Sequence, residues 1–212
     1  MGEEIKVGRR SIKITNPDKV LFPEDGYTKR DLIEYYEGIG EVMLPYVKDR
    51  LMTLERYPDG INGERFYSKN VPKYFPDWID RETVGKKGGT VTMVVANERA
   101  TLVYLGNQAA ITTHTSMHRV DKLGFPDQLM LDLDPSVDDF AEVRRIAKDV
   151  RGIFEELGLA PFVKTSGSRG LHVIAPLDRR ADVEAVRAFA HDVALLAAKR
   201  DPDRVTIEPS KA

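Results

Sequence analysis

Two aspartates separated by one residue are the clearest candidates for chemistry in this sequence. They belong to the segment Leu129–Pro135, in which leucines alternate with Met130, Asp132 and Asp134. In a β-strand this alternation places the leucines on one face and both carboxylates on the other, with the two aspartate Cα atoms about 6.6 Å apart. Such carboxylates can converge on a pair of divalent cations, and without a cation they repel each other. The alternative is a solvent-exposed strand face that ends in a turn at Pro135.

A glycine-rich segment further along the chain is the second candidate. Residues Thr165–His172 read Thr-Ser-Gly-Ser-Arg-Gly-Leu-His. Gly167 and Gly170 permit backbone conformations that turn N–H groups outward, and the serine hydroxyls and Arg169 can donate to phosphate oxygens. The alternatives are a simple hairpin turn and a loop that only clamps an RNA backbone. A phosphate site beside two metal-binding carboxylates would suit phosphoryl transfer.

The first half of the chain contributes a histidine and an aromatic pair. His114 ends an apolar segment shortly before the acidic strand, although a single histidine is commonly structural. Phe66 and Tyr67, with Lys69 nearby, combine aromatic rings and positive charge as base-stacking platforms do. Alternatively, one ring of the pair is a core residue and the other an edge residue.

Basic residues gather near the N-terminus. Lys13, Lys19, Lys29 and Arg30 lie within the first thirty residues, with Asn16 among them. They predict a local basic patch, and the alternative is a set of ordinary solvated lysines. A patch of this kind is needed for any nucleic-acid partner, because the net charge of the whole chain is −2.

Composition indicates a globular protein of the cytoplasm. The 212 residues contain no cysteine, which excludes disulfides and thiolate metal sites and fits a reducing compartment. No segment is apolar over a length that would span a membrane. We therefore expect a protein without a membrane partner.

The hydrophobic pattern divides the chain near residue 120. Before residue 120, the pattern predicts short strands and one helix. Thr28 and Asp31 are expected to begin this helix as a capping box, and Pro45 is expected to end it. Residues 70–80 are predicted to form an irregular connector with some helix. After residue 120, the pattern predicts strand, helix, strand, loop, strand and helix, with helix starts at Asp138 or Asp139 and at Asp182. The predicted class is α/β (α+β), with a small sheet covered by helices on one face and its other face free for the two aspartates.

These motifs together resemble those of a known family. Asp132-Leu-Asp134-Pro, followed by Ser166-Gly-Ser-Arg-Gly-Leu-His172, resembles the archaeo-eukaryotic primase superfamily, and most closely the polymerase domain of ligase D from prokaryotic non-homologous end joining. The segments Thr15–Pro23, Tyr57–Gly60 and Gln108–Ala110 fit the same family in the same order, so that the resemblance covers nearly the whole chain.

The resemblance implies a fold and an activity. The fold would be a single primase-polymerase domain with an N-terminal α/β module over residues 1–120 and an RRM-like palm unit over residues 121–212. The activity would be the addition of nucleotides, preferentially ribonucleotides, to a 3′-hydroxyl at gaps or double-strand breaks. NTP or dNTP and DNA would be substrates, a ligase and a Ku-type end-binding protein would be partners, and the location would be the nucleoid.

The resemblance also assigns roles by position. It implies two Mn²⁺ or Mg²⁺ ions on Asp132 and Asp134, and three further groups of contacts. These are the incoming nucleotide on His114, Ser166, Arg169 and His172, the 5′-phosphate of DNA on Asn16, Lys19 and Lys29, and the template on Phe66 and Tyr67.

Two departures from the family pattern bear on catalysis. Arg169 stands where the family commonly has lysine, which keeps the charge and changes its geometry. The family's third carboxylate lies on a strand after the last helix, whereas this sequence runs to Ala212 and its Glu208 comes too early to match. We therefore expect a domain truncated at its C-terminal end with an incomplete two-metal site. The alternatives are a DNA-end-binding module without catalysis and a metal-dependent phosphoesterase.

Overall fold

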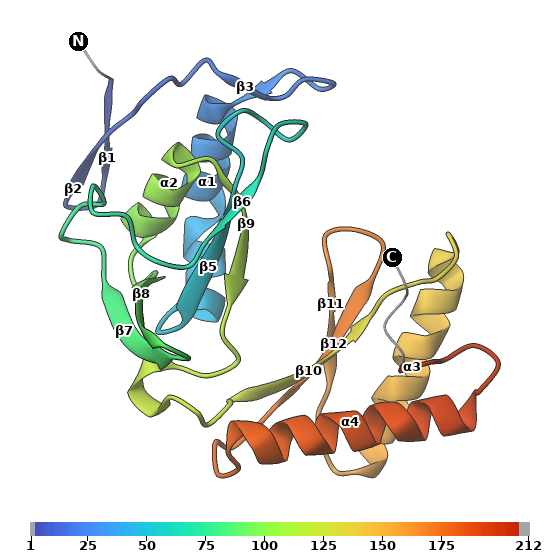
Figure 1. The fold of residues 1–212 in the computed structure, drawn as a ribbon. Coiled ribbons are helices and arrows are strands. Elements are labelled where there is room, and N and C mark those ends of the chain that lie inside the picture. The colour runs from blue at the N-terminus through green and yellow to red at the C-terminus, as the bar shows by residue number, and fades with distance from the viewer. Residues whose placement is uncertain (1–2, 208–212) are drawn as a thin grey trace. The chain divides into compact units, whose positions relative to one another are not determined.

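The computed structural model describes residues 3–207 and contains two compact units, Met1–Asp121 and Lys122–Ala212 (Figure 1). Both units are mixed α/β, and every strand pairing in them is antiparallel. The α/β class predicted from the sequence is thus confirmed. No helix among residues 3–207 has the length and apolar character that a membrane span needs.

The first unit is built around a five-stranded sheet. Its elements are β1 (Glu4–Val7), β2 (Arg10–Lys13), β3 (Val20–Phe22), β4 (Tyr27–Thr28), α1 (Lys29–Val47), β5 (Leu51–Arg56), β6 (Phe66–Ser68), β7 (Arg81–Lys86), β8 (Gly89–Val95), α2 (Arg99–Asn107) and β9 (Ala110–Thr115). A 3₁₀ turn (Val120–Lys122) follows where the chain passes from the first unit into the second. The strand β5 is central, because it pairs with β6, β8 and β9. This arrangement places side chains of β6 and β9 on either side of those of β5.

The helices α1 and α2 pack against each other beside this sheet (Figure 1). Their approach is close at Gly106, where an added Cβ would lie 2.8 Å from the Tyr36 ring. Tyr36 in turn donates its buried hydroxyl to the Ala110 carbonyl at 2.9 Å, which ties α1 to the start of β9.

Two local predictions in the first unit are wrong. The helix α1 begins with the predicted Thr28–Asp31 capping box, but it continues through Pro45 to Val47. A proline this close to the helix end removes one hydrogen bond of the last turn, and the Lys48 N–H still reaches the Leu44 carbonyl at 2.9 Å. Residues 70–80 form the irregular connector that was predicted, but they contain no helix; their turns are closed by the Pro72 and Pro76 carbonyls.

The second unit has the predicted order of elements. They are β10 (Gln128–Leu133), α3 (Phe140–Glu156), β11 (Phe162–Thr165), β12 (Leu171–Pro176) and α4 (Val183–Arg200). The sheet order is β10-β12-β11, so that β12 is central. The helix caps are the predicted ones: Asp139 accepts hydrogen bonds from the first turn of α3, and Asp182 does the same for α4.

The core of this unit lies between the sheet and its helices. Leu129 and Val173 from the strands pack with Val150 and Phe154 of α3 and with Val193 of α4. The leucines of β10 therefore face the helices as predicted, and Asp132 faces away from them. The strand ends at Leu133, so that Asp134 is the first residue beyond it.

Candidate active site

Asp132 lies opposite His172 in the antiparallel pairing of β10 with β12. The Asp132 Oδ1 atom is 3.2 Å from His172 Nε2; the aspartate side chain is 52% exposed and the histidine side chain only 15%. The His172 Nδ1 atom is buried without a hydrogen-bond partner. The histidine is therefore placed to orient the carboxylate, while the carboxylate remains open to solvent and to a ligand.

Asp134 lies against the glycine-rich loop between β11 and β12. A Cβ added to Gly170 would lie 2.5 Å from the Leu133 carbonyl oxygen and 3.0 Å from Asp134 Oδ1. Only glycine allows the loop to approach this closely, since real Cβ contacts are longer. The two segments singled out in the sequence thus lie together at one end of the sheet.

Ser166 shapes the loop from within. Its Oγ accepts hydrogen bonds from the backbone N–H groups of Ser168 (3.3 Å) and Gly170 (3.0 Å). Gly167 adopts a left-handed conformation with φ +91°, as predicted, whereas Gly170 has no positive φ. The expectation that the loop turns its N–H groups outward is therefore wrong for Ser168 and Gly170, because the serine side chain satisfies them.

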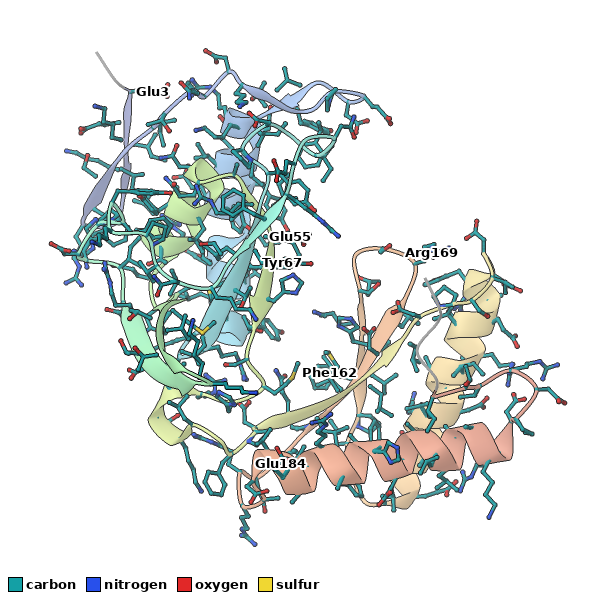
Figure 2. All side chains as sticks on the ribbon, in the orientation of Figure 1. Glu3, Glu55, Tyr67, Phe162, Arg169 and Glu184 are labelled. Atoms are coloured by element: carbon teal, nitrogen blue, oxygen red, sulfur yellow. The ribbon has the colours of Figure 1, made fainter. Side chains whose placement is uncertain are left out.

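The loop still presents donors for an anion. The Ser166 hydroxyl hydrogen is not used by the two bonds that its oxygen accepts. Arg169 is exposed at the tip of the β11–β12 hairpin (Figure 2), and its guanidinium makes no ion pair within residues 3–207. A free guanidinium on this loop is suited to bind phosphate oxygens.

The carboxylate side chains near β10 are of the type that binds a hard divalent cation. Carboxylate oxygens are the ligands that Mg²⁺ and Mn²⁺ prefer, and Mg²⁺ is commonly held by one or two carboxylates together with water and substrate phosphates. Asp132 and Asp134 supply two such carboxylates. No group of three metal-ligating side chains occurs within residues 3–207, and Glu208 lies outside the described residues.

The residues predicted to hold a 5′-phosphate lie together in the first unit. Lys19 donates its backbone N–H to the Asn16 carbonyl, and Lys29 donates its own to the Lys19 carbonyl. Lys29 is buried, and its Nζ donates to Thr15 Oγ1 at 3.0 Å rather than to a carboxylate. Burial, together with the positive charges of Lys19 and Arg56, lowers the pKa of Lys29. Among the described residues this ammonium is bonded to a hydroxyl and to no carboxylate, which makes it a favourable place for an anionic ligand.

The aromatic pair on β6 is exposed on both faces. Phe66 is 42% and Tyr67 55% exposed, so that the alternative of a core aromatic is excluded. Each ring has a guanidinium over it: Arg56 lies 5.2 Å from the Phe66 centroid, and Arg65 lies 6.0 Å from the Tyr67 centroid. Exposed rings backed by positive charge suit the stacking of nucleic-acid bases.

His114 lies on β9, in the first unit, beside this aromatic pair. Its ring centroid is 5.9 Å from that of Tyr67, and its Nε2 is 3.6 Å from Glu55 Oε2. Glu55 is a residue that the sequence analysis missed: its side chain is 6% exposed, and Arg65 and Tyr57 donate to it at 2.7 and 2.9 Å. Tyr57 follows Glu55 by two residues, but Arg65 and His114 come from outside β5, so no local spacing in the sequence points to this cluster.

Comparison with known proteins assigns the family. The family model of the LigD primase-polymerase domain matches residues 28–212. The multifunctional non-homologous end joining protein LigD of Mycolicibacterium smegmatis is 32% identical over 204 residues, which is 95% of this chain and 27% of that protein. The bifunctional non-homologous end joining protein LigD of Bacillus subtilis is 31% identical over 199 residues, or 93% of this chain and 32% of that protein.

A solved structure agrees with the same assignment. The polymerase domain from Mycobacterium tuberculosis ligase D in complex with DNA superposes with a TM-score of 0.89 at 33% sequence identity, covering 94% of this chain and 72% of that chain. The chain spans between a quarter and a third of the length of the two curated relatives. Since the family model covers most of the sequence and the fold agrees, the chain belongs to the LigD primase-polymerase domain family.

Proposed function

We propose that this chain is a DNA-repair primase-polymerase domain that adds nucleotides, preferentially ribonucleotides, to a 3′-hydroxyl at gaps or broken ends. The observation that carries the proposal is the meeting of Asp134 with the glycine-rich loop at Gly170, beside Asp132. This places two carboxylates next to a loop with phosphate-binding donors, which is the arrangement that nucleotidyl transfer requires. Membership of the family and the DNA complex of the structural neighbour support the same function.

The side chains of the second unit divide the work. Asp132 and Asp134 hold the metal, Ser166 and Arg169 bind the phosphates of the incoming nucleotide, and His172 orients Asp132 through its Nε2 atom. Two divalent cations, when bound, would supply activation of the 3′-hydroxyl and stabilisation of the leaving pyrophosphate.

The first unit recognises DNA in this proposal. Lys29, Lys19 and Asn16 bind the 5′-phosphate at a break, supported by the buried position of the Lys29 ammonium. Phe66 and Tyr67 stack on template bases, supported by their exposure and by the arginines over their rings. A ligase and a Ku-type end-binding protein would act on the same ends in this proposal.

A second function is favoured by one observation. Residues 3–207 contain no group of three side chains arranged to hold a metal ion together. A chain with two carboxylates alone could bind DNA ends through the 5′-phosphate pocket and catalyse little. The two proposals share the DNA contacts and differ in whether nucleotides are added.

Extension of a labelled primer across a gap with a 5′-phosphate, in Mn²⁺ with either NTPs or dNTPs, separates these functions. We expect extension by the unmodified chain, faster with NTPs, and none by the variant Asp132→Asn with Asp134→Asn. End binding without extension in both proteins would favour the end-binding module. Release of nucleotides from DNA in the absence of added NTP would instead indicate a phosphoesterase.

A further inference from the structure

The β1–β2 hairpin has an open edge beside α2 (Figure 1). Within residues 3–207, β2 pairs with β1 alone, and the Ile14 N–H that follows β2 donates to the Glu3 carbonyl at 2.8 Å. In an antiparallel pair, residues that bond the partner strand alternate with residues whose backbone groups face away from it. The backbone groups of Ser11, Lys13 and Thr15 therefore point away from β1 and form the open edge.

Asn107, the last residue of α2, closes one end of this edge. Its buried side-chain amide accepts a hydrogen bond from the Thr15 N–H at 3.1 Å and donates one to the Lys13 carbonyl at 2.9 Å. A residue of a neighbouring parallel strand would make the same two bonds with its backbone. One strand repeat earlier, the equivalent pair is the Ser11 carbonyl and the Lys13 N–H, and neither has a hydrogen-bond partner among the described residues.

A cavity of about 480 Å³ lies along the open edge. Besides residues of β2 and α2, its lining includes the aromatic rings of Tyr74, Trp78 and Tyr104, and its volume is in the range of pockets that bind ligands. Trp78 packs edge-on against Tyr104 at 6.1 Å between ring centroids. The Tyr104 hydroxyl and Trp78 Nε1 make no hydrogen bond in the part of the chain that the structure describes. The cavity thus combines aromatic walls with unused donors.

The charge of the cavity lining is positive. Among the described residues, Lys13 is the only charged residue of the lining, and its exposed ammonium forms no ion pair. Glu4 is the cross-strand partner of Lys13 on β1, but its carboxylate accepts a hydrogen bond from Ser11 Oγ at 2.7 Å. Arg10, also on β2, pairs with Glu98 at 2.8 Å. Lys13 is therefore the cation available to an acidic ligand.

We propose that the open edge of β2 and the aromatic cavity beside it, here called the β2 groove, bind an extended peptide of a partner protein. One peptide residue pairs with the Ser11 carbonyl and the Lys13 N–H. Its side chain, aromatic or apolar, lies on the same side as that of Ile12 and enters the cavity, and the next residue is acidic and lies beside Lys13. In this mode of recognition, backbone hydrogen bonds give affinity and the side-chain pocket gives specificity.

A peptide fits the β2 groove better than a nucleic acid does. The Ser11 carbonyl needs a hydrogen-bond donor, and a nucleic-acid backbone of sugar and phosphate has no N–H group to supply one. The proposal goes beyond nucleotidyl transfer, because none of the groove residues belongs to the proposed metal or nucleotide site.

Binding of a labelled peptide by the 212-residue chain tests the proposal. The probe is a fluorescein-labelled peptide, capped at both ends, of sequence Ser-Thr-Phe-Asp-Thr-Ser, and we expect saturable binding by fluorescence anisotropy. Methylation of the phenylalanine nitrogen removes the donor to the Ser11 carbonyl and should weaken binding at least fivefold. Replacement of the phenylalanine by alanine empties the aromatic cavity and should weaken binding about tenfold.

Substitutions in the hairpin test the charge contact. Lys13→Gln should weaken peptide binding about threefold, as for loss of an exposed ion pair. Lys6→Gln is the matched control, because Lys6 is an exposed lysine of β1 in the same hairpin and lies outside the groove. Its affinity for the peptide should be unchanged.

Amide hydrogen exchange tests the strand pairing separately. The Lys13 N–H is unbonded in the free protein and should exchange at least fivefold more slowly with saturating peptide. The Ile14 N–H already donates to the Glu3 carbonyl, so its exchange should not change.

Three results would overturn the proposal. They are no binding at millimolar peptide, equal binding of the N-methylated peptide, and binding that leaves the exchange of the Lys13 N–H unchanged. Binding of oligo(dT) that Lys13→Gln weakens and Lys6→Gln does not, without any peptide binding, would assign the groove to nucleic acid instead. Primer extension is measured independently of all these assays, so failure of this proposal is distinguishable from failure of the proposed function.

Discussion

Asp132 and His172 face each other across β10 and β12, with 3.2 Å between Oδ1 and Nε2. The contact links the half-exposed carboxylate to a mostly buried imidazole, so that the strand pairing itself fixes where the carboxylate points. Asp134, just beyond the strand, is fixed differently, by the approach of the Gly170 backbone. The two carboxylates are thus positioned by separate devices at the same end of one sheet.

Replacing both aspartates separates metal-dependent binding from DNA binding. The change Asp132→Asn with Asp134→Asn keeps the side-chain shapes and removes both negative charges, so that a divalent cation loses its protein ligands. We expect Mn²⁺-dependent binding of a fluorescent NTP to fall below detection, while affinity for 5′-phosphorylated DNA is retained. Equal loss of both affinities would contradict separate sites for nucleotide and 5′-phosphate.

Gly170→Ala tests the contact between the loop and Asp134. Its new Cβ would lie 2.5 Å from the Leu133 carbonyl, so that the loop or the strand end must move. We expect a loss of about 1–3 kcal/mol in the free energy of unfolding, as for overpacked sites, together with weaker nucleotide binding. Denaturant unfolding and nucleotide titration measure the two effects.

Gly152→Ala is the matched control for that substitution. Gly152 lies in α3, and an added Cβ there meets nothing within 4 Å. Alanine in a helix interior is favoured over glycine by about 0.5–1 kcal/mol, so a small gain in stability is expected with nucleotide affinity unchanged. A loss of nucleotide affinity in Gly152→Ala would mean that the Gly170→Ala effect is not local.

The second unit could be predicted from sequence because its signals are local. The apolar stripe of α3 and its Asp139 cap lie within one short segment, as does the alternation in β10. The prediction that Pro45 ends α1 was wrong because a proline near a helix end destabilises the helix less than one in its interior, and the residues after Pro45 continue the last turn. The effect of a proline on a helix thus depends on how far it lies from the helix end.

The residues of the candidate site could be proposed from the sequence, but their geometry could not. The acidic pair and the glycine loop were identified by type and spacing, but the inward turn of Ser166 depends on a backbone conformation that spacing does not encode. Glu55 was not predicted because Arg65 and His114 contact it from outside its own strand, and only Tyr57 lies close to it in the sequence. Contacts of that kind arise only when the strands pair.

Lys29→Met tests whether the buried Lys29 ammonium lowers the stability of the fold while it serves to bind a ligand. Burial lowers the pKa of Lys29 from its ordinary value of 10.5, so the folded state holds this proton less firmly than the unfolded chain. The free-energy cost of burying the charged Lys29 side chain is fully present at neutral pH, and it disappears as the pH rises through the lowered pKa toward 10.5. We therefore expect Lys29→Met to be more stable than the unmodified chain at pH 7, with a gap that closes at alkaline pH.

The same variant should bind DNA ends less well. Affinity for 5′-phosphorylated DNA should fall about tenfold through loss of a charged hydrogen bond, and affinity for the unphosphorylated end should change little. Unfolding measured at pH 7 and near pH 10, together with fluorescence anisotropy on the two DNAs, gives both results. A stability gap that is constant with pH would show that the lysine charge is not its origin.

The ion pair of Lys19 with Asp59 predicts a substitution that strengthens DNA binding. Lys19 Nζ lies 2.6 Å from Asp59 Oδ1, and the aspartate side chain is 70% exposed. A DNA phosphate must compete with this carboxylate for the same ammonium, so Asp59→Asn should strengthen binding to 5′-phosphorylated DNA and Lys19→Ala should weaken it.

Because each phosphate contact releases counterions, Lys19→Ala should also reduce the salt dependence of log Kd by about one unit of slope. Anisotropy titrations at several salt concentrations measure both quantities. If Asp59→Asn and Lys19→Ala change the affinity for phosphorylated and unphosphorylated ends alike, then Lys19 contacts the DNA backbone and not the 5′-phosphate.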